Sequence, residues 1–335
     1  AVDFITMGRA TIADPELVKK AKEGRPEEIR PCISCNQGCI ARVDAWCDVC
    51  CLANPLAGRE GDPHLRITPA AVKKNVVVVG GGPAGLMAAA TAAKRGHKVT
   101  LFESGSVLGG QFYLASLPPK KGELPRLLDY MERDARKNGV DIVLNYTATA
   151  ADIDSMKPDE VIMATGGTPL VLRIPGAERC ALAGEVLTGE KKVPGSCVVI
   201  GGGSVGCETA DFMTEHGSQV TIIEMLDTLC KDLEKRQRKL LLQKLIDAGT
   251  NTICNAKVLR IGEDFVEYES FGLVRRVMGV EHVVMAAGYK GTVPADVKEV
   301  CERASIPLHI VGDCTMNSHN ALISIREAYD CAVEL

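Results

Sequence analysis

The chain is 335 residues long, which is enough for two or three domains of ordinary size. Hydrophobic residues make up 46% of it and charged residues 24%, the composition of a soluble protein with apolar cores. The formal net charge is −4 and no long basic run occurs, so neither nucleic acid nor an anionic membrane surface is expected as a partner. No apolar run approaches the roughly 20 residues that span a bilayer, and the first residues lack the features of a signal peptide. We therefore expect a cytoplasmic protein, and a homo-oligomer remains open.

The fourteen cysteines do not read as a disulfide framework. The chain is large and shows no export signal, and cysteines such as Cys197 and Cys207 fall inside expected strands and helices, where they act as small buried hydrophobes. We expect reduced thiols, with a separate role for the cysteines near the N-terminus.

An internal repeat organises most of the chain. Three pairs of segments match, the first two at an offset of 121 residues and the third one residue out of step: 77–85 with 198–206, 96–103 with 217–224, and 161–166 with 283–288. Each copy reads as a buried parallel strand, a glycine turn, a helix that ends at a glycine, and a second strand. The sequence therefore predicts two Rossmann-like α/β units.

The first copy carries a dinucleotide fingerprint. Gly80, Gly82 and Gly85 follow a strand and open a helix, and Glu103 ends the next strand. In this context the glycines allow a tight turn, close approach of a pyrophosphate and close helix packing, while the acid accepts bonds from ribose hydroxyls. The alternative is that the glycines only shape a turn, which is much less plausible when the pattern occurs twice.

The second copy supplies the same groups from Gly201, Gly203, Gly206 and Glu224. A glutamate at the end of this strand would repel the additional phosphate of NADP, and no arginine follows it closely. The sequence thus favours NAD over NADP at this site.

Six cysteines near the N-terminus offer two ligand sets. Cys32, Cys35, Cys39 and Cys51 have iron–sulfur-like spacing, C-x2-C-x3-C-x11-C. A second selection replaces the last two by Cys47 and Cys50 and is close to a structural zinc pattern, C-x2-C-x11-C-x2-C. The spacing of the cysteines alone does not favour either ligand set over the other.

The segment Cys32-Ile-Ser-Cys-Asn-Gln-Gly-Cys39, followed by Cys51-Leu-Ala-Asn-Pro55, resembles the cluster loop of the 2,4-dienoyl-CoA reductase and 2-enoate reductase family, to which amine dehydrogenases are related. The resemblance implies a 4Fe-4S cluster held by Cys32, Cys35, Cys39 and Cys51, and it favours iron over zinc.

The resemblance extends to both sides of this loop. Residues 4–15 resemble the final strand and loop of an old-yellow-enzyme-like barrel, in which Gly8 and Arg9 would bind the phosphate of FMN. Residues 19–27 would be the closing helix of that barrel and its exit. A barrel needs about 250 residues, so its remainder is missing from this chain, as is any catalytic acid for substrate reduction.

Further flavin-site residues follow from the same resemblance. Gly110 and Gln111 lie in a segment that matches the FAD half of the family, and Gly312 and Asp313 resemble the segment that closes over the flavin. Thr165 and Gly288 stand at the two matched crossing points between the units. His309 and His319 flank the Gly312 turn and could line the flavin, although a lone loop histidine is more often structural.

The predicted architecture has four parts. We expect the end of a (β/α)8 barrel at 1–27, a cluster loop with its linker at 28–72, an FAD-binding domain at 73–190 and 286–335, and an inserted NAD-binding domain at 191–285.

The implied function is that of an NADH-dependent flavoprotein reductase acting on carbon–carbon double bonds. Electrons would pass from NAD(H) to FAD, to the cluster and to FMN, which reduces an activated double bond of a small enoate or enoyl-CoA substrate. The alternatives are an amine dehydrogenase relative, an NADH-dependent module that passes electrons to a partner protein, and a zinc-stabilised flavoprotein.

Overall fold

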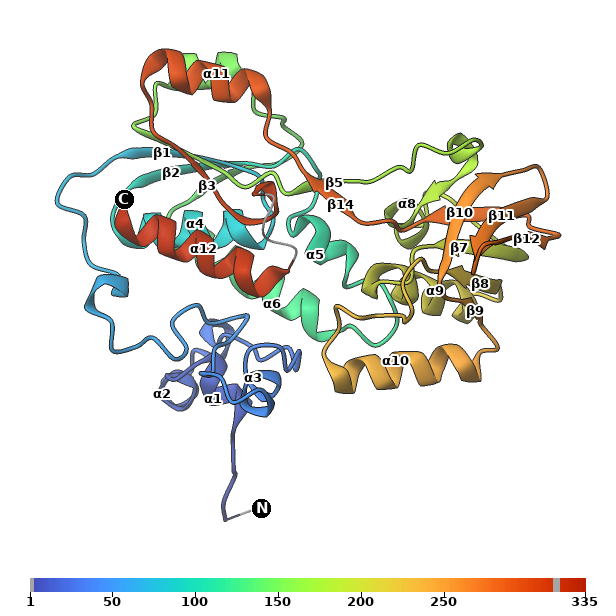
Figure 1. Ribbon diagram of the computed structural model, residues 1–335. Coiled ribbons are helices and arrows are strands. Elements are labelled where there is room, and N and C mark those ends of the chain that lie inside the picture. Colours follow the sequence, from blue (N-terminus) through green and yellow to red (C-terminus); the bar gives the residue numbers. More distant parts are fainter. Residues whose placement is uncertain (1–2, 316–319) are drawn as a thin grey trace. The chain divides into compact units, whose positions relative to one another are not determined.

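The computed structural model describes residues 3–315 and 320–335, and its described part divides into two compact units (Figure 1). The first unit takes in the chain up to Ser116, Gly122–Gly167, and the chain from Gly291 onward. The second takes in Leu117–Lys121 and Thr168–Lys290. His319 lies outside the described residues. Each unit is described by itself below.

A five-stranded parallel sheet organises the first unit, with the strand order β15-β4-β1-β2-β3. Its strands are β1 (Asn75–Val79), β2 (Lys98–Phe102), β3 (Asp141–Val143), β4 (Glu160–Met163) and β15 (Leu308–Ile310). Because β15 pairs with β4, the C-terminal part of the chain completes the sheet that the first glycine loop opens.

Helices cover both faces of this sheet. One face carries α4 (Pro83–Lys94), α6 (Glu123–Lys137) and α12 (Ala321–Glu334), and the other carries α7 (Ala150–Met156) and α11 (Ala295–Ala304). Val76 and Val78 belong to the first core, whereas Val77 and Val79 belong to the second. The unbroken run of valines is explained by this burial on both faces.

The second unit repeats the parallel sheet with the order β6-β13-β7-β8-β9. Its strands are β6 (Ala181–Leu182), β7 (Ser196–Ile200), β8 (Gln219–Ile223), β9 (Asn251–Ile253) and β13 (His282–Met285). The predicted NAD-binding domain, 191–285, lies within this unit, which also takes in residues 168–190 because β6 pairs with β13.

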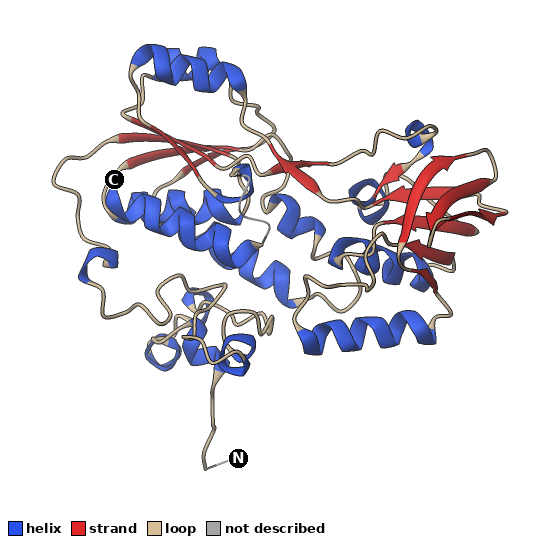
Figure 2. Cartoon of the chain, viewed as in Figure 1, coloured by secondary structure: helices blue, strands red, loops and turns tan. Residues whose placement is uncertain are grey.

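The two faces of the second sheet are covered differently. One face packs against the helices α8 (Ala183–Leu187), α9 (Ser204–Glu215) and α10 (Lys235–Asp247). The other packs against an antiparallel sheet of β10 (Ala256–Ile261), β11 (Phe265–Ser270) and β12 (Leu273–Met278), seen in red in Figure 2. The predicted fold class, two Rossmann-like α/β units, is confirmed by these parallel sheets.

The chain passes between the units four times, and two of these passages lie in paired strands. Strands β5 (Gly167–Pro169) and β14 (Tyr289–Gly291) pair as a two-stranded sheet, and each contains one of the crossing points. They directly follow the matched Ala-Thr-Gly and Ala-Ala-Gly segments of the repeat.

The N-terminal segment of the first unit is built from short helices. These are α1 (Arg9–Ala13), α2 (Leu17–Lys22), the 3-10 turn η1 (Pro26–Glu28), α3 (Ile40–Asp44) and the 3-10 turn η2 (Pro63–Leu65). The expected barrel strand is not seen, since residues 3–7 form no strand, and the expected closing helix at 19–27 is split between α2 and η1. A strand needs a neighbour for its backbone hydrogen bonds, and no described residue pairs with 3–7.

The linker part of the predicted 28–72 segment packs against the first unit. Leu65 is buried in the core of the first unit, and its carbonyl accepts a hydrogen bond from the Tyr329 hydroxyl. Arg59 forms a two-pronged ion pair with Asp330 on α12. These contacts fix the end of the cysteine loop on the first unit.

Among the described helices, none combines the length and the hydropathy needed to cross a membrane.

Candidate functional site: two glycine loops and a cysteine cavity

The first glycine loop leaves an open place where a ligand could approach. A Cβ at Gly80 would lie 2.3 Å from the Ala164 carbonyl oxygen, and one at Gly85 would lie 1.8 Å from that of Gly80. At Gly82, by contrast, no atom lies within 4 Å of the position of a Cβ. Packing therefore requires Gly80 and Gly85, while Gly82 keeps the backbone accessible in front of α4, as a dinucleotide phosphate needs.

The second loop reproduces this geometry. A Cβ at Gly201 would lie 2.3 Å from the Ala286 carbonyl oxygen, and one at Gly206 would lie 2.0 Å from that of Gly201. At Gly203 the neighbours of a Cβ would be the two Asp232 carboxylate oxygens, at 3.9 and 4.0 Å. The space in front of the N-terminus of α9 therefore contains the carboxylate of Asp232.

Both predicted ribose-binding acids also tie their glycine loops in place. Glu103 accepts hydrogen bonds from the amides of Gly81 at 2.7 Å and Gly105 at 2.6 Å. Glu224 accepts them from Gly202 at 2.5 Å and Leu226 at 2.7 Å. A carboxylate has about four lone-pair positions, so each acid can still accept from a ribose hydroxyl.

The remaining predicted flavin residues of the first unit lie near the carboxyl ends of its parallel strands. A Cβ at Gly110 would lie 3.6 Å from the Gly82 Cα, and one at Gly312 would lie 3.0 Å from the Ala84 Cβ. Gln111 donates from Nε2 to the Gly167 carbonyl at 3.0 Å. This edge of an open parallel sheet is where such folds bind ligands.

Thr165 and Asp313 lie at the same edge. The Thr165 hydroxyl donates to the Thr292 carbonyl and is 3.2 Å from Cys314 Sγ. Asp313 Oδ1 accepts from the Ser324 hydroxyl at 3.1 Å. Both side chains are therefore held in place by polar contacts within the first unit.

The structure does not gather two other candidates at this edge. Gly288 belongs to the second unit, where its carbonyl accepts from the Leu170 amide at 2.8 Å. His309 lies in β15 with Nε2 2.9 Å from Glu160 Oε2, and Glu160 is the first residue of β4. The His309 side chain thus contacts the carboxylate at the start of β4, away from the strand ends that form the glycine-loop edge.

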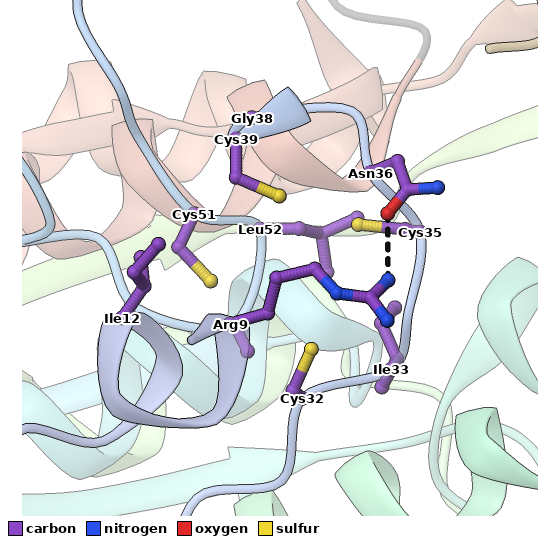
Figure 3. Close-up of a pocket in the computed structure, with 11 residues that line it drawn as sticks. Arg9, Ile12, Cys32, Ile33, Cys35, Asn36, Gly38, Cys39, Cys51 and Leu52 are labelled. Carbon is purple, nitrogen blue, oxygen red and sulfur yellow. Dashed lines mark hydrogen bonds between the residues drawn. The ribbon is translucent and has the colours of Figure 1, made fainter. Parts of the chain in front are cut away.

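Four of the N-terminal cysteines surround one cavity. Cys32, Cys35, Cys39 and Cys51 line it together with Arg9. Figure 3 shows their four sulfurs pointing toward a common space. Cys47 is exposed and Cys50 is buried, and neither lines this cavity. The fold therefore brings together the set with iron–sulfur-like spacing.

Two of the thiols that line the cavity, Cys35 and Cys51, are partly withdrawn from solvent. Burial raises the pKa of the Cys35 thiol to about 11, with smaller contributions from Cys51, Cys39 and Cys32, against a lowering backbone hydrogen bond from Gln37. Burial also raises the pKa of Cys51. Loading a metal group here must displace the protons of these thiols.

The described residues contain no group of three or more His, Cys, Asp or Glu side chains placed to hold a single metal ion. A zinc ion would need its four ligands about 2.3 Å away, and therefore within about 4 Å of one another. A 4Fe-4S cluster takes one cysteine thiolate at each iron, and four cysteines line this cavity. The donor set is all thiol, as a 4Fe-4S cluster requires.

Arg9 lies at the cysteine cavity. Its Nη1 donates to Asn36 Oδ1 of the cysteine loop at 2.7 Å, a bond that Figure 3 shows as a dashed line. Gly8 precedes α1, and a Cβ there would meet no atom within 4 Å. The role of both residues in binding FMN phosphate stays a prediction.

Two charged residues at the second loop escaped the sequence analysis. Glu208, on the second turn of α9, is buried and forms an ion pair with Lys121. Burial raises the pKa of Glu208, and the Lys121 ammonium opposes this. The repeat could have pointed to Glu208. The matching position in the first copy, 121 residues earlier, is the apolar Met87, so a charged residue at 208 departs from the repeat. The second residue is Asp232, whose carboxylate lies at the start of α9.

Residues 74–308 match the pyridine nucleotide-disulphide oxidoreductase family, and the chain belongs to that family. The family is one of oxidoreductases, and it implies FAD and NAD(H) as cofactors.

Individual relatives point to a narrower group. The chain is 42% identical over 318 residues to an NADH oxidase of Thermoanaerobacter brockii, covering 93% of this chain and 48% of the relative. It is 41% identical over 223 residues to a cinnamate reductase of Clostridium sporogenes, covering 67% and 33%. A solved 2-naphthoyl-CoA reductase superposes with a TM-score of 0.94 at 33% identity, over 100% of this chain and 51% of that one.

These matches confirm the resemblance to the 2-enoate and dienoyl-CoA reductase type. The chain spans between 33% and 51% of the length of these three relatives.

Proposed function

We propose that this chain is the electron-input part of a longer NADH-dependent reductase that acts on an activated carbon–carbon double bond. Electrons enter from NADH at the second unit, pass to FAD at the first, and leave through a 4Fe-4S cluster toward FMN. The observation that carries the proposal is that one compact unit contains both an open glycine loop and a cavity lined by four cysteines.

The first unit supplies a fitting site for FAD. Gly82 leaves its backbone open in front of α4, and Glu103 is held at the end of β2. A Cβ at Gly110 would lie 3.6 Å from the Gly82 Cα. The N-terminus of α4 favours the negative charge of a diphosphate. These residues would bind the flavin nucleotide and fix its orientation.

The cysteine cavity supplies a fitting site for the cluster. Cys32, Cys35, Cys39 and Cys51 would each ligate one iron, and the buried Leu52 and Ala53 beside the last ligand keep water away. FAD exchanges hydride with NADH, and an iron–sulfur cluster carries single electrons, so together they convert a two-electron donor into a one-electron supply.

Arg9 and Gly8 support the FMN end of the route. Arg9 is an exposed guanidinium next to the cysteine cavity, and a planar guanidinium suits paired bonds to a phosphate. The names of two relatives, a cinnamate reductase and a 2-naphthoyl-CoA reductase, support an unsaturated acid or its CoA thioester as substrate. We assign no catalytic acid to this chain.

The test compares two cysteine variants of the chain. Cys35→Ala removes a proposed ligand, whereas Cys47→Ala removes an exposed thiol that does not line the cavity. After anaerobic reconstitution, Cys35→Ala should lose iron and acid-labile sulfide but still reduce a two-electron dye with NADH, and Cys47→Ala should match the unchanged chain in both.

The same variants in the complete protein separate the two halves of the route. There Cys35→Ala should also lose reduction of cinnamate-type substrates. Zinc in place of iron, or full substrate reduction by Cys35→Ala, would overturn the proposed route.

A further inference from the structure

An acidic side chain occupies the start of α9 in the second unit. The Ser204 amide donates to both carboxylate oxygens of Asp232, at 3.0 and 3.2 Å. The Ser204 hydroxyl donates to Asp232 Oδ2 at 2.5 Å. Asp232 is therefore the hydrogen-bond acceptor for the Ser204 amide, which directly follows Gly203.

This amide is one that a dinucleotide phosphate would use. In a glycine fingerprint the pyrophosphate lies against the helix N-terminus, close to the second glycine. Apart from the Asp232 carboxylate, no atom lies within 4 Å of a Cβ position at Gly203. The negatively charged Asp232 carboxylate therefore lies beside the place where the phosphate of a dinucleotide would bind.

The first copy shows that the fold does not need this contact. The residue that corresponds to Ser204 at the offset of 121 is Pro83, which has no amide hydrogen. The loop at Gly82 is otherwise built in the same way, with no atom near a Cβ position. The carboxylate is a feature of the second site alone.

The segment that carries Asp232 is anchored on both sides. The Cys230 amide donates to the Gly202 carbonyl at 2.7 Å, and α10 begins at Lys235 with the buried Glu234 as its cap. Asp232 itself is exposed on the short turn between these anchors. A change of its side-chain rotamer is enough to release Ser204 while the backbone stays in place.

We propose that Asp232 gates the nicotinamide-nucleotide site. Its carboxylate stands in for a phosphate at the Ser204 amide, and a dinucleotide binds only when the carboxylate turns out to solvent. The inference rests on the proposed assignment of this loop to NAD(H). The gate lowers affinity for any ligand that brings a diphosphate, because two anions compete for one helix N-terminus.

The test measures dissociation constants for three ligands by calorimetry on the FAD-loaded chain. NADH and ADP-ribose both carry the diphosphate, and adenosine carries none. The variants are Asp232→Asn, which keeps a cap without the charge, Asp232→Ala, which removes both, and Asp247→Asn, which removes one exposed carboxylate at the end of α10.

Asp232→Asn and Asp232→Ala should bind NADH and ADP-ribose about tenfold more tightly than the unchanged chain, the scale of one charge-assisted bond. Adenosine affinity should not change, and Asp247→Asn should match the unchanged chain. Equal or weaker binding of NADH and ADP-ribose by both Asp232 variants overturns the gate. Failure of every form, the unchanged chain included, to bind NADH overturns the NAD assignment together with the gate.

Discussion

Glu224 accepts a hydrogen bond from the Gly202 amide at 2.5 Å and so joins the end of β8 to the second glycine loop. Glu103 makes the corresponding bond to Gly81 at 2.7 Å in the first unit. The acid of each fingerprint is therefore part of the loop's own structure before any ribose is bound. Because the acid both holds the loop and is predicted to bind a ribose, its removal should affect stability and nucleotide binding together.

Glu224→Ala should lower both the stability of the second unit and its affinity for NADH. The change leaves the amides of Gly202 and Leu226 without their carboxylate partner, which costs about 1–3 kcal/mol in the free energy of unfolding. Thermal unfolding and NADH titration measure the two effects, with the exposed Glu215→Ala as control. Unaltered unfolding of Glu224→Ala, or a preference of the unchanged chain for NADPH, would contradict this assignment.

Gly82→Ala and Gly85→Ala should fail in different ways. A methyl group at Gly85 would lie 1.8 Å from the Gly80 carbonyl oxygen, so this variant should fold poorly or not at all. A methyl group at Gly82 meets nothing within 4 Å, so Gly82→Ala should fold normally and lose FAD, whose phosphates need that space. Circular dichroism and the flavin-to-protein ratio measure the two outcomes. Full FAD content in a folded Gly82→Ala protein would show that the phosphates lie elsewhere.

Lys121→Met should destabilise the second unit because it leaves the buried Glu208 carboxylate without its cation. We expect a loss of about 1–3 kcal/mol in the free energy of unfolding, whereas the same change at the neighbouring Lys120 should cost little. The double variant Lys121→Met/Glu208→Gln should recover most of the loss, since no unpaired charge remains. Denaturant unfolding of the unchanged chain, Lys121→Met, Glu208→Gln and the double variant completes the cycle. Equal losses in Lys120→Met and Lys121→Met would refute the pairing.

Asp14 should make the cysteine-loop segment sensitive to acid. Burial opposes its ionisation, but the Lys20 ammonium and the amides of Arg30 and Glu16 outweigh this and hold the pKa of Asp14 below its usual value. The stabilisation by the ionised form is therefore complete above the usual pKa of an aspartate, about 3.9, and is lost as the pH falls through the lowered pKa.

Asp14→Asn should consequently lower stability by about 1–3 kcal/mol at neutral pH, and the difference from the unchanged chain should shrink as the pH falls below about 4. Urea unfolding across this pH range measures it. The exposed Asp48→Asn is the matched control. A difference that grows on acidification would contradict the sign of the shift.

Local patterns sufficed for the parts of the molecule that depend on neighbours in sequence. The valine run 76–79 predicted a strand buried on both faces, and the spacing of Gly80, Gly82 and Gly85 predicted the turn into α4. The repeat predicted the second unit in the same terms. The four-cysteine set was separated from its zinc alternative by the family resemblance, and the cavity now supports that choice through Cys51.

Other features depend on contacts that no local pattern encodes. Asp232 reaches Ser204 across 28 residues of sequence, and Lys121 reaches Glu208 across 87. Residues 4–15 were expected to contain a barrel strand because they resemble one in the family, and residues 3–7 form no strand because no described strand pairs with them. The periodicity of a sequence predicts which face of a helix or strand is buried. It does not predict which side chain from a distant part of the chain will contact a site.

The most direct test of the central claim is an anaerobic titration of the reconstituted chain with NADH, combined with iron, sulfide and FAD analysis. The account predicts about four irons per FAD and uptake of about three electrons, two by the flavin and one by the cluster. Cys35→Ala should take up about two electrons and contain no cluster. A chain that binds FAD but takes no electrons from NADH, or that takes up the same number with and without Cys35, would contradict it.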